Sequence, residues 1–322
     1  MPFPILGLHH VTATVDEAQP DLDFSVGTLG LRLVKKTVNF DNHHVYHFYY
    51  GDERGTPGTI WTTFPYHGRG VRTGVKGAGQ VTRTSFSVPA GSLDRWEARL
   101  RARGIAASRI RRFDEDTIQC SDSSGLHFEL VGTERDRRDP WTGSGLDAGM
   151  AIRGLHSVTM VVRDVEPTVG LMREMLGFEV AGEQGDRTRV AVNGSEPGKW
   201  IDIVRAPDAD AAINGIGTVH HVAMAIDRPD DQVRLREELL ARGLKVTEVR
   251  DRCYFQSIYF REPGGVLFEV ATTSPGFAAD EDVSALGEGL RLPPWEEEHR
   301  ADIEEHLVPV LVPGRSPSPT PS

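Results

Sequence analysis

One short pattern occurs four times along the chain, and this repetition limits the possible folds more than any other feature. Each copy opens with an apolar run typical of a strand: LHHVTATV from Leu8, VTRTSFSV from Val81, LHSVTMVV from Leu155 and VHHVAMAI from Val219. Apolar residues at helical spacing follow, over residues 19–29, 92–103, 166–176 and 230–242. Further β-rich runs complete each copy. The pattern predicts an α+β protein built from four β-α-β-β-β modules.

A glycine ends each predicted helix at the same place in the module. Gly30, Gly104, Gly177 and Gly243 each precede an apolar residue that starts the next strand. Glycine readily takes the left-handed conformation that ends a helix. Four such glycines in register therefore indicate one repeated unit.

The modules are expected to pair, because a single module would leave open strand edges and a half-covered apolar face. Four modules predict two domains, over residues 1–140 (modules 5–66 and 79–132) and 141–275 (modules 152–206 and 217–273). The polar run RDRRDPWTGSGLDAGM is interpreted as the linker between modules two and three. A helical extension is expected over 276–312, where Pro-Pro precedes helix formers, and a disordered Pro- and Ser-rich tail over 313–322.

Charge and cysteine content exclude several classes of partner. The formal net charge is -11 with no long basic run, which argues against binding nucleic acid or an anionic membrane. The two cysteines, Cys120 and Cys253, lie far apart and suit a reducing compartment rather than a disulfide framework. The N-terminus lacks the features of a secretory signal, and no run approaches the ~20 apolar residues of a membrane span. A cytoplasmic location is expected.

Two pairs of adjacent histidines, one near each end of the chain, stand out among the twelve. Successive side chains of a strand face opposite sides, so one histidine of each pair should face a site. His10 shares its side with the polar Thr12, whereas the neighbours on the side of His9 are apolar. The same test selects His221, beside small alanines, over His220. Strand parity thus predicts that His9 and His220 point away from the site.

Glu269 lies in an apolar strand, and a buried carboxylate needs a cation or strong donors. With His10 and His221 it would form a 2-His-1-carboxylate set with open positions, which suits Fe(II), although Zn²⁺ is chemically possible. Modules two and three have Arg83 and Ser157 in place of the histidine. Modules one and four are therefore predicted to form the metal-bearing pair.

Two further groups receive a structural interpretation. Glu129, in GLHFELVG, occupies the place that Glu269 has in GVLFEVAT, and without histidine partners it is predicted to be hydrogen-bonded or paired with an arginine. His43 and His44 follow Asp41 and are interpreted as surface residues of a turn.

Several segments together resemble the ring-cleaving dioxygenases of the hydroquinone dioxygenase type, which are vicinal oxygen chelate (glyoxalase-like) proteins. The segments are ILGLHHVTATVDEAQPDLDF, LVKKTVNFD, YHFYYGDERGTPGT, TVHHVAM, RDRCYFQSIYFREPGGVLFEVAT and LPPWEEEHRADIEEHL. The resemblance covers nearly the whole chain short of the tail. It implies the vicinal oxygen chelate fold and an extradiol-type enzyme that uses Fe(II), or sometimes Mn(II), to open hydroquinone- or catechol-like rings. A small aromatic molecule and O₂ would be its substrates.

The resemblance also implies roles for individual residues. It places the metal on His10, His221 and Glu269, which strand parity selects independently. The other residues that it implies are Thr12, Arg252 and Tyr259 on the substrate side, and His9 and His220 beside the metal ligands. We expect Arg252 and Tyr259 to stabilise negative charge on substrate or oxygen.

Two other readings stay open at the level of sequence. The first is a glyoxalase-like isomerase or thiol transferase, which is disfavoured because TIWTTFPY in module one has no glutamate at the matching place. The second is a binding protein without catalysis. The C-terminal helix could serve as a lid or as a contact in a homo-oligomer.

Overall fold

The computed structural model describes residues 2–314 and contains the four expected modules. Module one consists of β1 (Ile5–Val15), α1 (Ala18–Leu22), β2 (Arg32–Asn39), β3 (Asn42–Gly51) and β4 (Ile60–Pro65). Module four consists of β13 (Thr218–Ile226), α4 (Pro229–Ala241), β14 (Arg250–Asp251), β15 (Gln256–Arg261) and β16 (Leu267–Thr272). Module two consists of β5 (Gln80–Val88), α2 (Leu93–Ala102), β6 (Ala107–Arg112), β7 (Glu115–Ser121) and β8 (His127–Gly132). Module three consists of β9 (Gly154–Val162), α3 (Glu166–Leu176), β10 (Glu179–Gln184), β11 (Arg187–Ala191) and β12 (Trp200–Arg205).

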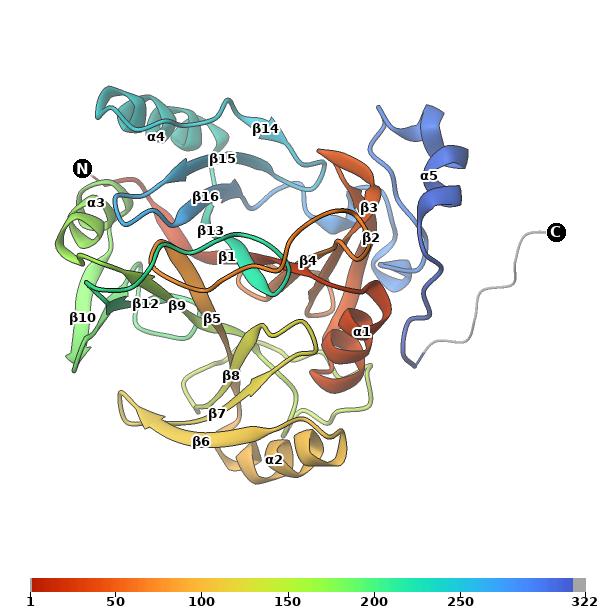
Figure 1. The fold of residues 1–322 in the computed structure, drawn as a ribbon, viewed down its shortest axis with the longest axis horizontal. Helices are drawn as coiled ribbons and strands as arrows, with labels where there is room; N and C mark the ends of the chain where they lie inside the picture. Colours follow the sequence, from red (N-terminus) through yellow and green to blue (C-terminus); the bar gives the residue numbers. More distant parts are fainter. Residues whose placement is uncertain (1, 315–322) are drawn as a thin grey trace.

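The modules pair into two curled eight-stranded sheets (Figure 1). The first sheet has the order β14-β15-β16-β13-β1-β4-β3-β2, so it joins modules one and four. The second has the order β10-β11-β12-β9-β5-β8-β7-β6 and joins modules two and three. In each sheet the modules meet through an antiparallel pair of their opening strands, β1 with β13 and β5 with β9. The predicted pairing of module one with module four is confirmed, whereas the division into two domains at residue 140, which groups modules one and two, stays a prediction.

The helices begin and end close to their expected places, with two differences. Gly30, Gly104, Gly177 and Gly243 all have positive φ angles, as the repeated helix stop requires. The first helix is not one α-helix over residues 19–29, because α1 gives way to a π-helix at Asp23–Thr28. The C-terminal α-helix, α5, covers only Arg300–His306, because turns and a short 3₁₀ segment occupy the preceding residues.

The core joins the two sheets. The ring of Phe128 on β8 lies 5.2 Å from the ring of Trp61 on β4 and 5.0 Å from that of Phe24, which follows α1. The loops that connect the modules also pair with each other, through bridges from Thr73 to Ile216 and from Val75 to Ile213. These contacts hold the first sheet, formed by modules one and four, against the second.

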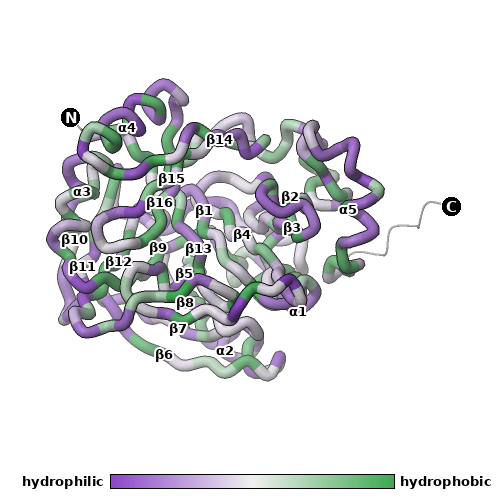
Figure 2. The backbone as a smooth tube through the Cα atoms, turned by 45° about the horizontal axis from the view of Figure 1, so that its top comes forward, coloured by the Kyte–Doolittle hydropathy of each residue, from purple (hydrophilic) through white to green (hydrophobic). Residues whose placement is uncertain are grey.

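The segment after β16 folds back onto the first sheet. Phe277 packs against Tyr49 of β3 and against Tyr254. The ammonium group of Lys35, fully buried on β2, forms ion pairs with Asp280 and Glu281. Helix α5 lies beside β3, as both views show (Figures 1 and 2). This C-terminal segment therefore covers part of the sheet that carries the candidate site.

Hydrophilic and hydrophobic positions alternate along α4 and α5, as expected of helices that lie on the surface (Figure 2). None of the helices within residues 2–314 has the length and apolar character that crossing a membrane requires. Cys120 and Cys253 are free thiols, as expected. The tail predicted to be disordered lies, from residue 315 onward, outside the described residues.

Candidate active site

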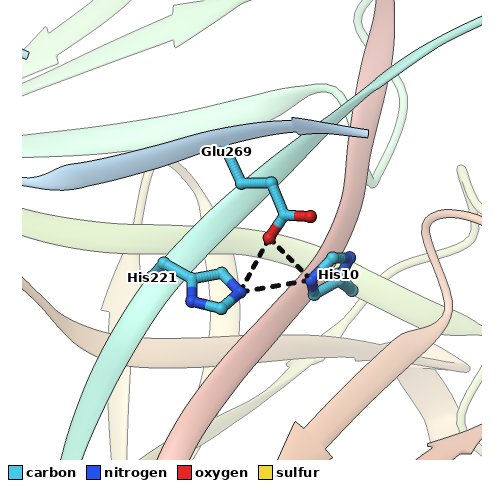
Figure 3. Close-up of side chains that lie close together, drawn as sticks. All are labelled: His10, His221 and Glu269. Atoms are coloured by element: carbon cyan, nitrogen blue, oxygen red, sulfur yellow. Dashed lines mark hydrogen bonds and ion pairs between the residues drawn. The ribbon is translucent and has the colours of Figure 1, made fainter. Parts of the chain in front are cut away.

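The side chains of His10, His221 and Glu269 meet on the first sheet, from β1, β13 and β16 (Figure 3). Glu269 Oε2 lies 2.8 Å from His221 Nε2 and 3.2 Å from His10 Nε2. The two Nε2 atoms lie 3.3 Å apart. All three side chains are buried. Three ligand atoms thus converge on one point, and among the described residues they form the buried group that could hold a metal ion.

Hydrogen bonds on the far side of His10 determine which nitrogen faces this point. His9 Nε2 lies 3.2 Å from the carbonyl oxygen of Thr272, which can only accept. Burial and the proximity of His10 lower the pKa of His9 to about 3, so His9 is neutral and its Nδ1 must accept. His10 Nδ1, 2.8 Å away, then donates to it. The Nε2 of a neutral His10 is left with a lone pair directed at Glu269 and His221, as a metal ligand requires.

The electrostatics of Glu269 suit a cation. Ser257 donates a hydrogen bond to Glu269 Oε1, but Oε2 accepts no hydrogen bond from a described residue and is fully buried. Burial acts to raise the pKa of this carboxyl, yet His10 and His221 outweigh it and hold the pKa well below its usual range. Burial also lowers the pKa of His221, which favours the neutral, ligating imidazole. The carboxylate is thus stabilised by positive charge and N–H groups of the histidines, and a divalent metal ion bound by neutral imidazoles would supply that charge in their place.

The first histidine of each pair occupies an irregularity in its strand. The register between β1 and β13 shifts at His9 on one strand and at His220 on the other. His9 and His220 are the extra residues at these shifts, and each directly precedes a candidate metal ligand. In both pairs the two Nδ1 atoms lie 2.8 Å apart, His9 from His10 and His220 from His221. Unlike His9, His220 lines the cavity. The prediction that His220 points away was wrong, because parity fails at a β-bulge.

A cavity of about 400 Å³ opens in front of His10 and His221, a size that suits a small ligand. Aromatic rings form much of its wall: Phe40, Tyr49, Phe64, Tyr66, Phe255 and Tyr259. Of the residues predicted for the substrate side, Thr12, Arg252 and Tyr259 all line it. A planar ring would therefore find apolar faces on several sides and the candidate metal ligands at one end.

Arg252 and Tyr259 form a pair at the cavity wall. Arg252 Nε donates to the Tyr259 hydroxyl at 3.1 Å, and the guanidinium carbon lies 5.3 Å from the centre of the tyrosine ring. Burial raises the pKa of Tyr259, so its hydroxyl stays protonated. Because the hydroxyl oxygen accepts from Arg252, its hydrogen is available to another acceptor. The carboxylate of Asp41 lies 3.8 Å from Arg252 Nη2 at the same wall.

One cavity residue, His47 on β3, was missed in the sequence. His47 Nε2 lies 2.9 Å from Thr62 Oγ1, and Thr62 in turn donates to Thr12 Oγ1 at 2.9 Å. Thr62 must therefore accept from His47, which leaves Nδ1 as the free acceptor of a neutral ring. Burial, followed by the proximity of His10, lowers the pKa of His47 well below 6.5. A signal was present, because in VYHFYYG the strand alternation puts His47 on the same side as Tyr49.

The second sheet has ion pairs where the first has the candidate metal site. Glu129 on β8 lies opposite Ser85 on β5, as Glu269 lies opposite Ala223 in the first sheet, so the two glutamates occupy equivalent strand positions. It accepts hydrogen bonds from Arg112 at 3.0 Å and from Gln119 at 2.8 Å. The prediction of an arginine partner for Glu129 is confirmed. Within residues 2–314, the groups that could hold a metal ion include none from this sheet.

Comparisons with known proteins agree with this geometry. Residues 154–270 match the model of the Glyoxalase/Bleomycin resistance protein/Dioxygenase superfamily. A protein of Bacillus subtilis (strain 168) named as a ring-cleaving dioxygenase is 42% identical over 307 residues, which cover 95% of this chain and 97% of that protein. The chlorohydroquinone/hydroquinone 1,2-dioxygenase of Sphingobium indicum is 36% identical over 303 residues, covering 91% and 93% of the two chains.

Solved structures show the same fold. The crystal structure of a protein from Bacillus subtilis, titled as a dioxygenase, superposes with a TM-score of 0.92 at 42% identity and covers 96% of this chain and 99% of that chain. Glyoxalase I from Zea mays superposes with a TM-score of 0.60 at 12% identity, covering 84% of this chain and 92% of that chain. At that identity the likeness to glyoxalase I concerns the fold alone.

Proposed function

We propose that this chain, which belongs to the glyoxalase/bleomycin resistance protein/dioxygenase superfamily, opens hydroquinone- or catechol-like rings with O₂. Its relatives named as ring-cleaving and hydroquinone dioxygenases support a dioxygenase function. The proposed metal is Fe(II), with Mn(II) as the alternative and Zn²⁺ less favoured. Its ligands would be His10, His221 and Glu269. The 2-His-1-carboxylate set is typical of Fe(II) oxygenases and leaves coordination positions for substrate and O₂.

The convergence of three ligand atoms beside an aromatic cavity is the observation that carries this proposal. Glu269 Oε2 accepts no hydrogen bond from a residue within 2–314, and the Nε2 atoms of both histidines lie within 3.2 Å of it. The histidines also line the cavity, so one side of the metal would be open to a ligand. A purely structural metal site would instead be closed by protein ligands.

The metal, when bound, would acidify a substrate hydroxyl and bring ring and O₂ together. The residues of this chain supply the proton chemistry around it. Nδ1 of the neutral His47 is a proton acceptor at the cavity wall, and its tautomer is held by Thr62. The Tyr259 hydroxyl donates to an oxygen on which negative charge develops, and the adjacent Arg252 keeps positive charge at that wall.

The substrate would bind as a flat ring between aromatic side chains. Phe64 and Phe255 lie on the cavity wall, and the Phe255 ring lies 5.2 Å from that of His10. Such walls favour an aromatic ring through burial and stacking, and Arg252 and Tyr259 are among the polar residues that can contact its substituents. The cavity is consistent with a dihydroxylated ring whose hydroxyl groups point toward the histidines.

The glyoxalase reading is less favoured because, among the described residues, module one has no carboxylate at the position that Glu269 occupies in module four. Thr62 on β4 is the residue of module one that is equivalent to Glu269 of module four. Thr62 lies opposite Thr12 on the neighbouring strand, as Glu269 lies opposite Ala223. Its hydroxyl is engaged with His47 and Thr12. A binding protein without a reactive metal would leave unexplained why three possible metal ligands converge beside the cavity.

Oxygen uptake by the purified chain would test the proposal. Protein reconstituted anaerobically with Fe(II) should consume O₂ with hydroquinone or a catechol, and isotope-labelled O₂ should place both oxygen atoms in the ring-opened product. Protein reconstituted with Mn(II) or Zn²⁺ compares the metals. Metal binding without oxygen uptake across a panel of hydroquinones and catechols would sink the dioxygenase proposal, and conversion of a hemithioacetal by the same protein would favour the glyoxalase reading.

A further inference from the structure

A second group of histidines lies outside the cavity, where the C-terminal segment meets the hairpin between β2 and β3. His43 and His44 are near the start of β3, and His299 and His306 come from the C-terminal segment. Four of the twelve histidines are thus gathered at one contact. The interpretation of His43 and His44 as residues of a turn needs correction, because both lie on β3, where they stay partly exposed and contact the C-terminal segment.

Acidic partners hold the two β3 histidines in place. His43 Nδ1 lies 2.7 Å from Glu296 Oε2, and His44 Nε2 lies 2.7 Å from Asp302 Oδ2. The rings of His43 and His44 are 4.5 Å apart, and the ring of His306 stacks on His44 at 4.2 Å. One nitrogen of His43, one of His44 and a carboxylate oxygen of Asp302 all lie within 4.8 Å of one another.

This donor set has a definite chemical preference. Imidazole nitrogens with a carboxylate oxygen suit Zn²⁺, Cu²⁺ and Ni²⁺, whereas Mg²⁺ and Ca²⁺ prefer oxygen ligands. The side chains of His43 and His44 are 34% and 29% exposed, so an ion can reach them from solvent. We propose that His43, His44 and Asp302 form a second metal site, of the Zn²⁺ class, which is separate from the one at His10, His221 and Glu269.

A third cluster on the surface provides a natural comparison. Asp16, Glu17 and His67 also offer ligand atoms within 4.8 Å of one another, and His67 Nδ1 lies 2.9 Å from Asp16 Oδ1. This group has a single histidine and two carboxylates, and the His67 side chain is 64% exposed. It shares the ion-pair chemistry of the proposed site but lacks its pair of imidazoles. It should therefore bind Zn²⁺ much more weakly.

The position of the second site links it to the cavity wall. The tip of the same hairpin supplies Asn39, Phe40 and Asp41 to the cavity. The ring of Phe40 also contacts that of Trp295 in the C-terminal segment, at 5.6 Å between centres. An ion shared by the hairpin and α5 would join the segment to this wall by coordinate bonds. Its occupancy should slow local opening of the C-terminal segment.

Zinc binding to the full-length protein would test the proposal independently of catalysis. The first site is loaded with Fe(II) anaerobically, and Zn²⁺ alone is then titrated by calorimetry, with bound metal counted by elemental analysis. The wild type should bind one Zn²⁺ beyond its iron. His44→Gln and, separately, Asp302→Asn should lose that Zn²⁺ and keep the iron, whereas His67→Gln should keep both metals.

Several outcomes would overturn the proposal. A wild type that binds no Zn²⁺ beyond its iron, or a His44→Gln protein that binds as much Zn²⁺ as wild type, would show that the cluster is held by ion pairs alone. Loss of Zn²⁺ from His67→Gln would assign it to the other cluster. Protease digestion gives a second readout, because Zn²⁺ should slow cleavage within residues 295–306 in wild type but not in His44→Gln. Equal slowing in both would likewise count against the site.

Discussion

The Nε2 atoms of His10 and His221 lie 3.3 Å apart although 211 residues separate them in the chain. The antiparallel pairing of β1 with β13 produces this approach, since Thr12 lies opposite His221 and His10 lies opposite Ala223. Two opening strands of repeated modules thus present equivalent histidines to each other. Glu269 reaches the same point from the strand next to β13.

Removal of one histidine should separate metal binding from folding. We expect His221→Ala to lose the metal and all measurable oxygen uptake, because two ligands remain and Glu269 is left buried without a cation. Elemental analysis and an oxygen electrode check this. Glu129→Gln is the matched control in the second sheet, where the equivalent glutamate meets Arg112. Glu129→Gln should keep its metal and its activity and lose on the order of 1–3 kcal/mol of stability. Loss of metal from Glu129→Gln together with its retention in His221→Ala would place the metal in the second sheet instead of the first.

The hydroxyl of Tyr259 should matter for rate more than for binding. Tyr259→Phe removes the donor beside Arg252 but keeps the ring, so kcat should fall roughly 10²-fold while metal content stays at the wild-type level. Steady-state kinetics with a hydroquinone measures the change. Tyr66→Phe is the matched control, because Tyr66 lines the same cavity and its hydroxyl accepts only from Asn39 among the described residues. Equal losses in both variants would argue for packing rather than catalysis.

His47 is expected to act on protons and not on the metal. His47→Asn should lower kcat by roughly 10²-fold to 10⁴-fold, because the neutral acceptor at Nδ1 is lost. Metal content should not change, and added imidazole should restore part of the rate by entering the space that the ring leaves. Loss of metal from this variant would instead indicate that His47 is a ligand, and an unchanged kcat would remove it from the mechanism.

Asp21 should make stability depend on pH. This buried carboxyl accepts from Tyr50 and from Thr63, and burial raises its pKa from 3.8 to about 7. The folded state therefore holds the proton more tightly than the unfolded state, and the stabilisation present below pH 4 is lost as the pH rises to about 7. The loss is on the order of 4 kcal/mol. Urea unfolding of wild type and Asp21→Asn from pH 4 to 8 should show the wild type losing more stability; parallel curves would contradict this.

The buried charge of Lys35 should hold the C-terminal segment on the sheet. Lys35→Met leaves Glu281 buried with one ion-pair partner fewer and should cost about 3–5 kcal/mol, since breaking a buried pair strands a charge. Chemical unfolding measures the cost, and faster protease cleavage between residues 276 and 312 locates it. Arg95→Met breaks the exposed pair with Asp147 and should change the stability much less, because solvent screens that pair. Similar losses of stability in Lys35→Met and Arg95→Met would contradict the view that the buried charge of Lys35 holds the C-terminal segment on the sheet.

Much of the fold was readable because it repeats. Four helix-ending glycines and four similar opening strands predicted the modules, and the absence of histidines at Arg83 and Ser157 predicted which modules pair. The ends of elements were harder to predict: the π-helix at Asp23–Thr28 has six residues, too few for its i→i+5 hydrogen bonding to leave a distinct apolar period in the sequence.

The site was predicted in part, and its failures have physical reasons. Strand parity selected His10 and His221, but it assumes unbroken alternation, and the bulge at His220 turns that side chain toward the cavity. His47 was passed over because aromatic residues flank it in VYHFYYG, and because its place in one cavity with His221 and Arg252 of module four appears only in the folded chain. The gathering of His43 and His44 with Asp302 depends on how a segment more than 250 residues away folds back.

The pairing of the first strand with the thirteenth also has a consequence for biosynthesis. His10 leaves the ribosome early, whereas Glu269 becomes available only after most of the chain has been made, roughly 15–50 s later at ~5–20 residues per second. Until then β1 has no β13 to pair with and the nascent chain offers no complete metal pocket. The three proposed metal ligands can therefore meet only after module four has been synthesised.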